Sequence, residues 1–275
     1  LTSIGLAASA SGNIPAFTAI NTGTSPVIAT ITVTPTFENG GVSCTGPATP
    51  FEITVNPTAQ VNPTVDMVVT DGEDVDIPFS TINTGGTSTY TWTNTDPTTG
   101  LTNTGSSDIG FTAVNTGTSP ITTTVVVTPT FENGGNSNSG ATDTFIITVN
   151  PTAQIDPIDS LVFCDEDVVD PIVFTTQNSG GTTTYSWTND NTNIGLSASG
   201  TGDIASFAVT AGTVSETSTI VVTPTYTNNG ISCDGPSETF TITVNPTAQV
   251  NNILSQILCE GESTDAIEFT TINSD

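Results

Sequence analysis

A six-residue phrase, Val-Asn-Pro-Thr-Ala-Gln, occurs three times in this chain, and its spacing limits the possible folds more than any other feature. The copies span residues 55–60, 149–154 and 244–249, so their starts lie 94 and 95 residues apart (149 − 55 and 244 − 149). Self-similarity at a fixed period is typical of repeat architectures. A period of this length is too long for one coil of a solenoid and fits a complete small domain. The sequence therefore predicts a tandem array of domains.

Each copy of the phrase follows a pattern that is typical of a β-strand. Residues 51–55, 145–149 and 240–244 place Phe, Ile and Val at alternate positions, which is the period of a strand with one buried face. The proline that follows has no N–H for a ladder and fixes φ, so the last strand of each domain should end there. Because the next apolar run begins a few residues later, the connections leave little slack, and we expect a semi-rigid rod.

The period divides the chain into two complete repeats and two partial ones. We expect residues 1–62 to be the C-terminal part of a first repeat, 63–157 and 158–252 to be complete repeats, and 253–275 to be the N-terminal part of a fourth. Short segments rich in Thr and Val, separated by Gly and Asn turns, predict an all-β sandwich of about seven strands in each repeat.

Two repeats carry an aromatic pair with strand spacing, which ends at Trp92 in one and at Trp187 in the other. We interpret each Trp as the central side chain of a sandwich core. The alternative is an exposed aromatic that stacks on a sugar ring.

Composition excludes several classes of function. The chain has no Lys, Arg or His against 27 Asp and Glu, so its formal net charge is −27. Nucleic acid is excluded as a partner, because phosphate binding depends on Lys and Arg, and adhesion to anionic lipid is excluded for the same reason. No apolar run is long enough to span a membrane, so membrane insertion is not expected.

The same composition removes most catalytic chemistry. Ser-His triads, Schiff bases and His-based metal sites are impossible without His and Lys. A carboxylate pair is the remaining option, but Glu38 and Glu132 are matched by Thr227 in the third repeat, and Glu52 is matched by Ile146. Because a catalytic pair has no reason to change between copies of its own domain, we expect no enzyme.

Four cysteines occupy two positions within the period. Cys164 and Cys259 follow the first strand of a repeat, whereas Cys44 and Cys233 precede the last strand. The second repeat lacks both, and this paired loss predicts a Cys164–Cys233 disulfide. Such a bond would close a loop of about 69 residues and contribute roughly 4 kcal/mol. Two cysteines without His are too few ligands for zinc.

An acidic cluster recurs after the first strand of each repeat. Its members are Asp71, Glu73, Asp74 and Asp76 in the second repeat, Asp165, Glu166, Asp167 and Asp170 in the third, and Glu260, Glu262 and Asp265 in the fourth. Clustered oxygen ligands suit Ca²⁺, although the spacing differs from that of an EF-hand. Calcium is thus the one candidate cofactor, and a solvated acidic turn is the alternative.

Thr-x-Thr runs, as at Thr122–Thr124, raise the alternative of an ice-binding face. Thr is also a good strand former on an exposed face, so both explanations stay open.

The segments TYSWTNDNTNIGLSASGTGDI, TIVVTPTYTNNGISCDGP and TFTITVNPTAQV together resemble a known repeat. They are similar to the PKD-like, immunoglobulin-related domains repeated in very large surface and secreted proteins of Bacteroidota-type bacteria, including gliding-motility adhesins. The resemblance implies a tandem array of immunoglobulin-like (PKD-like) β-sandwich domains of about 95 residues, in an extracellular stalk or filament. Asp159-Ser160-Leu161 is similar to the O-glycosylation motif of such bacteria, which makes Ser160 a candidate glycosylation site.

We therefore expect a structural segment of a large extracellular, cell-surface adhesin or fibre. Its expected partners are the neighbouring repeats of the same polypeptide, and lateral self-association of the rods stays open. The alternative is a glycan- or surface-binding immunoglobulin-like module of a secreted protein.

The two ends of the chain are expected to be cut within a domain. Leu1 corresponds to Asn191 and Asp275 to Gly180, so residues that match 181–190, with their Tyr-x-Trp strand, are missing from both partial repeats. We expect a window on a longer polymer in which Cys44 and Cys259 pair with cysteines beyond the ends.

Overall fold

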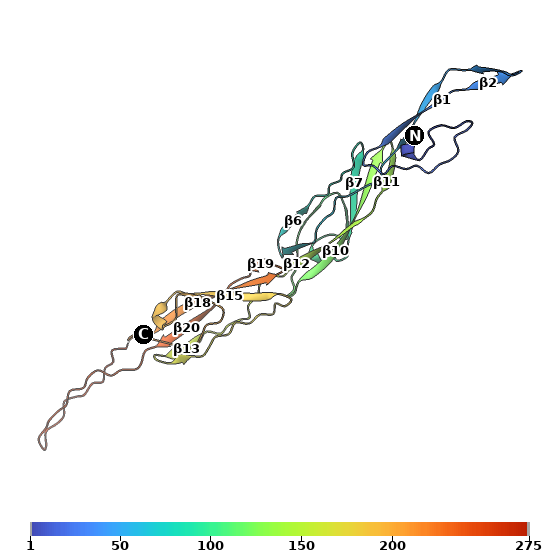
Figure 1. Ribbon diagram of the computed structural model, residues 1–275. Helices are drawn as coiled ribbons and strands as arrows, with labels where there is room; N and C mark the ends of the chain where they lie inside the picture. Colours follow the sequence, from blue (N-terminus) through green and yellow to red (C-terminus); the bar gives the residue numbers. More distant parts are fainter. Residues whose placement is uncertain (1, 274–275) are drawn as a thin grey trace. The chain divides into compact units, whose positions relative to one another are not determined.

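A computed structural model describes residues 2–273 and shows an all-β protein (Figure 1). The chain forms two compact units, each described by itself below. Unit 1 comprises the residues up to Val114 together with Ile121–Val149, and unit 2 comprises Asn115–Pro120 together with the residues from Asn150 onward.

The strands of unit 1 belong to two segments of the chain, a first repeat segment and the second repeat. The elements of the first segment are η1 (Thr2–Ile4), β1 (Val27–Val33), β2 (Thr36–Asn39), β3 (Val42–Thr45) and β4 (Thr49–Val55). Those of the second repeat are β5 (Met67–Thr70), β6 (Asp74–Ile77), β7 (Thr87–Asn94), η2 (Pro97–Thr99), β8 (Thr104–Ser106), β9 (Ile109–Thr112), β10 (Ile121–Asn133), β11 (Asn136–Ser139) and β12 (Asp143–Asn150).

The third repeat has the same order of elements. They are β13 (Leu161–Cys164), β14 (Val168–Val169), β15 (Thr182–Asn189), η3 (Thr192–Ile194), β16 (Ser199–Thr201), β17 (Phe207–Ala208), β18 (Glu216–Asn228), β19 (Ile231–Asp234) and β20 (Glu238–Asn245).

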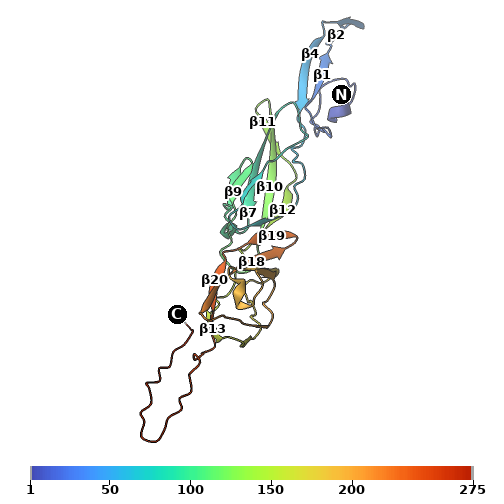
Figure 2. The ribbon, with the colours of Figure 1, turned by 90° about the vertical axis from the view of Figure 1, so that its left-hand side faces the viewer.

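Both complete repeats are sandwiches of a larger and a smaller sheet. The larger sheets have the strand orders β5-β12-β10-β7-β8 and β13-β20-β18-β15-β16, and the smaller ones are the pairs β6–β9 and β14–β17. Figures 1 and 2 show β10 lying beside β7 and β12. The predicted fold class, tandem immunoglobulin-like β-sandwich domains, is confirmed.

The proline inside the longest strand marks a change of neighbour. β18 pairs with β20 as far as Val222 and with β19 from Thr225 onward, so Pro224 lies in the gap between these two partners. β10 has the same arrangement around Pro129. A missing N–H costs least where one neighbouring strand ends and the next begins.

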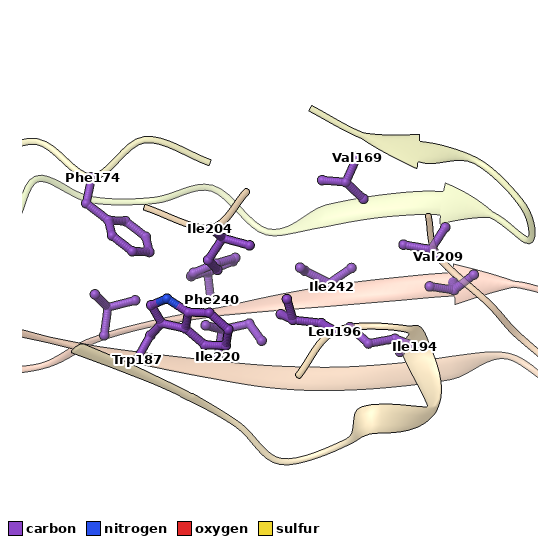
Figure 3. Close-up of a cluster of buried hydrophobic side chains, with 12 residues drawn as sticks. Val169, Phe174, Trp187, Ile194, Leu196, Ile204, Val209, Ile220, Phe240 and Ile242 are labelled. Atoms are coloured by element: carbon purple, nitrogen blue, oxygen red, sulfur yellow. The ribbon is translucent and has the colours of Figure 1, made fainter. Parts of the chain in front are cut away.

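The core of each repeat is built from the alternating apolar residues of the larger sheet. Trp92 and Trp187 are each 7% exposed, which confirms that both are core side chains. Figure 3 shows Trp187 beside Ile220 on the larger sheet, with Phe174 across from Trp187 and Val169 across from Ile242 in the opposite layer.

A glycine on the neighbouring strand makes room for each indole ring. A Cβ at Gly200 would lie 2.3 Å from the ring of Trp187, and a Cβ at Gly105 would lie 2.2 Å from that of Trp92. The recurrence of Gly at this register position therefore follows from the size of the Trp side chain that it accommodates.

The segments on either side of these two sandwiches bury less. Phe37 is 72% exposed, whereas Phe131 at the matching position is 0% exposed because its ring lies against Gly86, just before β7. Residues 246–273 form no strand.

Candidate functional site: the linker and its asparagine clamp

The repeated phrase binds the β-hairpin of the repeat that follows it. In unit 1 the Asn56 side chain donates to the Asn133 and Asn136 carbonyls at 3.1 and 3.3 Å, and the Asn133 amide donates back to Asn56 Oδ1 at 3.0 Å. Asn150 and Asn228 form the same reciprocal pair in unit 2. Paired side-chain amides fix the direction in which the chain enters the repeat, because each amide both donates and accepts.

The alanine of the phrase lies under a glycine of the same hairpin. A Cβ at Gly140 would be 1.7 Å from the Ala59 carbonyl oxygen, and one at Gly235 would be 1.8 Å from that of Ala153. Any other residue at these glycines would push the linker away. The linker is therefore packed against the repeat that follows it.

One asparagine then fastens the end of the phrase. In unit 1, Asn83 Oδ1 accepts from the Gln60 backbone N–H at 2.7 Å, and Asn83 Nδ2 donates to the Thr58 carbonyl at 3.2 Å. The same Nδ2 lies 3.4 Å from the carbonyl of Thr24, in the loop before β1. The Thr24 carbonyl also accepts from the Thr84 N–H at 2.8 Å. We call this arrangement the asparagine clamp.

The clamp recurs twice in unit 2 with nearly the same geometry. Asn178 accepts from the Gln154 N–H at 2.6 Å and donates to the Thr152 carbonyl at 3.2 Å. It also donates to the carbonyl of Thr118, which belongs to this unit, at 3.4 Å. Asn273 binds the last copy of the phrase through the residues that match these, Gln249, Thr247 and Thr213.

Sequence reasoning missed the clamp residues. The available signal was Thr-x-Asn, which occurs at Thr81–Asn83, Thr176–Asn178 and Thr271–Asn273. In each copy the threonine hydroxyl donates to Oδ1 of the Asn two residues later at 3.1 Å, and this hydrogen bond orients the Asn side chain toward the linker. The motif is local, but its partners lie more than 20 residues away, so its role became visible only in the fold.

The clamp holds backbone groups and performs no chemistry of its own. A groove of about 1050 Å³ in unit 1 is lined in part by Asn56, Asn133 and Asn138, and its lining contains no ionisable side chain. The arrangement can therefore fix the path of the chain through contacts to its backbone groups.

The structure corrects the predicted Cys164–Cys233 disulfide. Cys164 pairs with Asn245, one residue beyond the Val244–Glu216 pair at the start of β18, whereas Cys233 pairs with Tyr226. At least ten residues of strand (226 − 216) therefore separate the two cysteines, on the order of 30 Å, and a disulfide needs Cα atoms within about 7 Å. Cys233 donates instead to the Pro151 carbonyl at 3.2 Å. The disulfide prediction is wrong, because register places the two thiols at opposite ends of the sheet.

Cys44 and Cys259 are both exposed. Their expected partners lie beyond the chain, and the expected correspondences of Leu1 and Asp275 fall outside the described residues.

The recurring acidic cluster is explained by a turn. In the third repeat Asp167 accepts from the Cys164 N–H at 2.8 Å, and Glu73 and Glu262 make the same i to i+3 contact at 2.9 and 2.8 Å. Asp165 accepts from the Ala211 N–H and from the Thr247 hydroxyl.

The other predicted calcium ligands do not join these carboxylates in a site. Within residues 2–273 no three acidic or cysteine side chains converge as a metal site would require. The structure thus favours the capped turn over the calcium site.

Three exposed carboxylates have lowered pKa values because they accept hydrogen bonds. The backbone N–H of Thr219 is the main cause for Asp190, the hydroxyl of Thr175 for Asp156, and the hydroxyl of Thr98 for Asp96. Burial raises the pKa of Tyr185, and the nearby carboxylates of Asp156 and Asp203 add to the shift. These are local turn and strand-end contacts.

Ser160, the candidate glycosylation site, is exposed one residue before β13, and its hydroxyl accepts from the Thr241 N–H at 3.1 Å.

The fold resembles that of tandem β-sandwich proteins at low sequence identity. Mouse cadherin-23 EC22-24 is 12% identical with a TM-score of 0.34, covering 80% of this chain and 74% of that one. The fibronectin(III)-like modules of Clostridium thermocellum CbhA are 14% identical with a TM-score of 0.29, covering 69% and 95%. The chicken CNTN1 FN1-FN3 domains are 11% identical with a TM-score of 0.30, covering 83% and 92%. These likenesses concern the fold alone.

No family model matches the sequence, and no curated protein matches it. No helix within residues 2–273 is long and apolar enough to cross a membrane. By its own sheets, the chain consists of immunoglobulin-like β-sandwich repeats in tandem.

Proposed function

We propose that this chain is a load-bearing segment of an extracellular stalk or filament, in a large cell-surface adhesin built from PKD-like repeats. The observation that carries the proposal is the pairing of the first and last strands of the third repeat. β13 and β20 lie side by side and parallel, in register from Leu161↔Ile242 to Cys164↔Asn245. The chain therefore enters the sheet at one end and leaves it at the other.

This topology suits tension along the chain. A pull on the two ends of the repeat slides β13 along β20, so that all the hydrogen bonds between them are loaded at once. If the entry and exit were at the same end, the same bonds would open one after another. Two further hydrogen bonds extend the pairing of β13 with β20 beyond its ends. Ser160 accepts from the Thr241 N–H, and the Asp165 N–H donates to the Asn245 carbonyl.

The linker supports the same role. The asparagine clamp holds the Gln154 N–H and the Thr152 carbonyl, and Gly235 packs closely against the Ala153 carbonyl, so this part of the phrase is fixed to the repeat and resists extension. Long reach in a tandem protein requires connections of this kind, because flexible linkers let the ends approach each other.

The glycan-binding alternative has less support. Both Trp side chains are buried, so neither offers a platform on which a sugar ring could stack. Extracellular placement follows from the proposed role as a surface stalk. The wholly acidic composition is compatible with it, since a large charge of one sign limits lateral clumping.

Single-molecule force spectroscopy tests the proposal with two pulling directions on the same repeat. Handles are attached to introduced cysteines in a chain whose native cysteines are replaced by Ser. Asp159→Cys with Gln249→Cys loads β13 and β20 in shear, whereas Asp159→Cys with Glu238→Cys opens them from one end.

We expect a clearly higher unfolding force in the first direction. Equal forces in both directions would overturn the load-bearing role. Matching thermal melts of the two handle variants serve as the control for folding.

A further inference from the structure

Two hairpins of unit 1 contain the same six residues, Thr-Phe-Glu-Asn-Gly-Gly. They are residues 36–41 at the β2–β3 turn and 130–135 at the β10–β11 turn. In both hairpins the asparagine ends its strand and pairs with the residue three positions later. The glycines of both turns have positive φ: 61° at Gly40, 80° at Gly41, 62° at Gly134 and 75° at Gly135. Sequence, register and turn conformation are therefore matched around Asn39 and Asn133.

The two asparagines differ in their contacts to the linker phrase. Asn133 Nδ2 donates to Asn56 Oδ1 at 3.0 Å, and Asn56 Nδ2 donates in return to the Asn133 carbonyl at 3.1 Å. Asn133 is half-buried, whereas Asn39 is exposed. The linker therefore fixes the side chain of Asn133, while that of Asn39 lies open to solvent.

An asparagine that is followed by glycine has a specific reactivity. The backbone nitrogen of the glycine attacks the side-chain carbonyl carbon of the asparagine, a C–N bond forms, the bond to the side-chain nitrogen breaks, and ammonia leaves. Water then opens the resulting ring at either of its two carbonyl–nitrogen bonds and gives aspartate or isoaspartate. The net change is asparagine plus water to a carboxylate plus ammonia, without oxidation or reduction. Glycine favours the reaction because it has no Cβ to shield its nitrogen and few backbone restrictions.

We propose that Asn133 is a deamidation site whose reactivity is controlled by the linker. Ring closure requires the Asn133 side chain to fold back over the nitrogen of Gly134, and this movement takes its Nδ2 away from Asn56. A Cβ built at Gly134 would meet no described atom within 4 Å, so no neighbouring group obstructs the attack. The linker contact is therefore what slows the reaction, and the site becomes reactive when the linker leaves the hairpin.

The product cannot restore the contact that it replaces. A carboxylate at residue 133 has no N–H to donate to Asn56 Oδ1 and instead faces it with further acceptors. Rotation of the Asn56 amide would withdraw its Nδ2 from the carbonyls of Asn133 and Asn136, which it reaches at 3.1 and 3.3 Å. The chain has no Lys, Arg or His to balance the added charge. Deamidation thus converts a temporary release of the linker into a permanent one.

The third repeat has the same amide pair in a different sequence. Asn228 pairs with Asn150, but the residue after Asn228 is Asn229, and glycine follows one position later. The Asn-Gly dipeptide of this hairpin, residues 229–230, is exposed at the turn and is shifted away from the amide that holds the linker. The device therefore belongs to the second repeat. It requires only the linker contact, so it is independent of the stalk proposal.

The test follows the full chain during incubation in mildly alkaline buffer made with heavy-oxygen water. Peptide mass mapping measures deamidation at each Asn-Gly dipeptide, and isoaspartate among the products identifies the ring intermediate. In the wild-type chain we expect Asn39 to react several-fold faster than Asn133. Asn56→Ala should raise the rate at Asn133 toward that at Asn39, while the rate at Asn39, the internal control, stays the same.

Asn138→Ala is a second variant that leaves Asn56 in place. Asn138 donates to the Pro57 carbonyl at 3.1 Å, so its removal loosens the linker through a different contact and should also accelerate the reaction at Asn133. Circular dichroism melts confirm that both variants are folded. Equal rates at Asn39 and Asn133 in the wild-type chain would overturn the proposal, as would a rate at Asn133 that neither variant changes.

The permanence of the change is measured on a variant that carries the product from the start. Asn133→Asp should speed amide hydrogen exchange within residues 56–60, where the linker is held, and should leave exchange within 150–154, the matching linker of the third repeat, as in wild type. Unchanged exchange within 56–60 would show that the linker rebinds to the carboxylate, and the proposed device would then be wrong.

Discussion

One residue position has the same backbone conformation in successive repeats. The turn after the first strand has a residue with positive φ in the second, third and fourth repeats: Gly72 at 81°, Glu166 at 70° and Gly261 at 88°. Only glycine adopts this conformation without cost, because a Cβ crowds the following carbonyl oxygen. The third repeat therefore has a non-glycine residue where its neighbours have glycine.

Glu166→Gly should stabilise the third repeat by up to about 1 kcal/mol, because it removes the strain of the left-handed residue while the added freedom of the unfolded chain offsets part of the gain. The N–H of residue 166, which donates to the Val209 carbonyl, is kept. Chemical denaturation measures the change. The reverse substitution, Gly72→Glu, should destabilise the second repeat, and stabilisation by both would contradict the explanation.

A second prediction at this scale concerns pH. The Thr219 N–H holds the pKa of Asp190 below its ordinary value of 3.8. A carboxylate with a lowered folded-state pKa contributes stability above its unfolded-state pKa, and this contribution is lost as the pH falls through the folded-state value.

Asp190→Asn should therefore melt at a lower temperature than wild type at neutral pH. The difference should begin to shrink as the pH falls below the ordinary value of 3.8 and should vanish below the lowered folded-state pKa, because the side chain then becomes neutral first in the unfolded and then in the folded wild-type chain. Scanning calorimetry at several pH values measures it. A difference that does not change with pH would mean that the charge of Asp190 contributes nothing.

At the scale of an element, the structure of the linker phrase is decided by its contacts with the repeat that follows it. Its proline ends a strand, as expected, and its other residues serve contacts to the following repeat. The asparagine pairs with a hairpin amide, the alanine fits beneath a glycine, and the glutamine N–H is held by the asparagine clamp. The linker is thus an ordered part of the fold rather than a spacer.

Removing the clamp should loosen this element. Asn178→Ala deprives the Gln154 N–H of its acceptor and the Thr152 carbonyl of a donor, and unsatisfied polar groups cost about 1–3 kcal/mol each when buried. We expect a lower melting temperature for the third repeat and faster hydrogen exchange at Gln154. Asn193→Ala, at an exposed position of η3, is the control and should change neither.

The contact between glycine and alanine gives an independent check on the same element. Gly235→Ala would force its Cβ against the Ala153 carbonyl oxygen, and overpacking of this kind typically costs about 1–3 kcal/mol. Gly212→Ala meets no atom within 4 Å and should be nearly neutral. If the two variants have equal unfolding midpoints in urea, the linker does not pack as described.

At the scale of the whole molecule, stability comes from sandwich cores and backbone pairing. Neither a disulfide nor a metal site joins the described parts of the chain: the thiols lie on separate levels of the sheet, and no three acidic or cysteine side chains converge. The formal charge of −27 has no cationic side chain to balance it.

Added reductant should therefore leave the melting temperature unchanged. Calcium and chelator should give the same midpoint once ionic strength is matched, whereas monovalent salt alone should raise it by screening self-repulsion. Differential scanning fluorimetry under these four conditions is sufficient. A rise that is specific to calcium would restore the metal site, and a fall with reductant would restore a disulfide.

The sequence alone determined the features that depend on near neighbours. The period of the repeated phrase gave the tandem array, and alternation of apolar residues gave the strands and the buried Trp92 and Trp187. The proline predicted where each closing strand ends, because its fixed φ and missing N–H are properties of that one residue. These predictions hold since side-chain alternation and backbone restriction act over one or two residues.

Only the tertiary structure decided the rest. Cys164 and Cys233 recur and disappear together in sequence, yet strand register separates them along the sheet, and a shared pattern carries no information about distance. Asn83 and Asn178 looked like ordinary loop residues until the fold brought distant carbonyls to them. Which residues meet across dozens of positions depends on how strands pair and pack, and this is set by the combined burial of the whole domain rather than by any local motif.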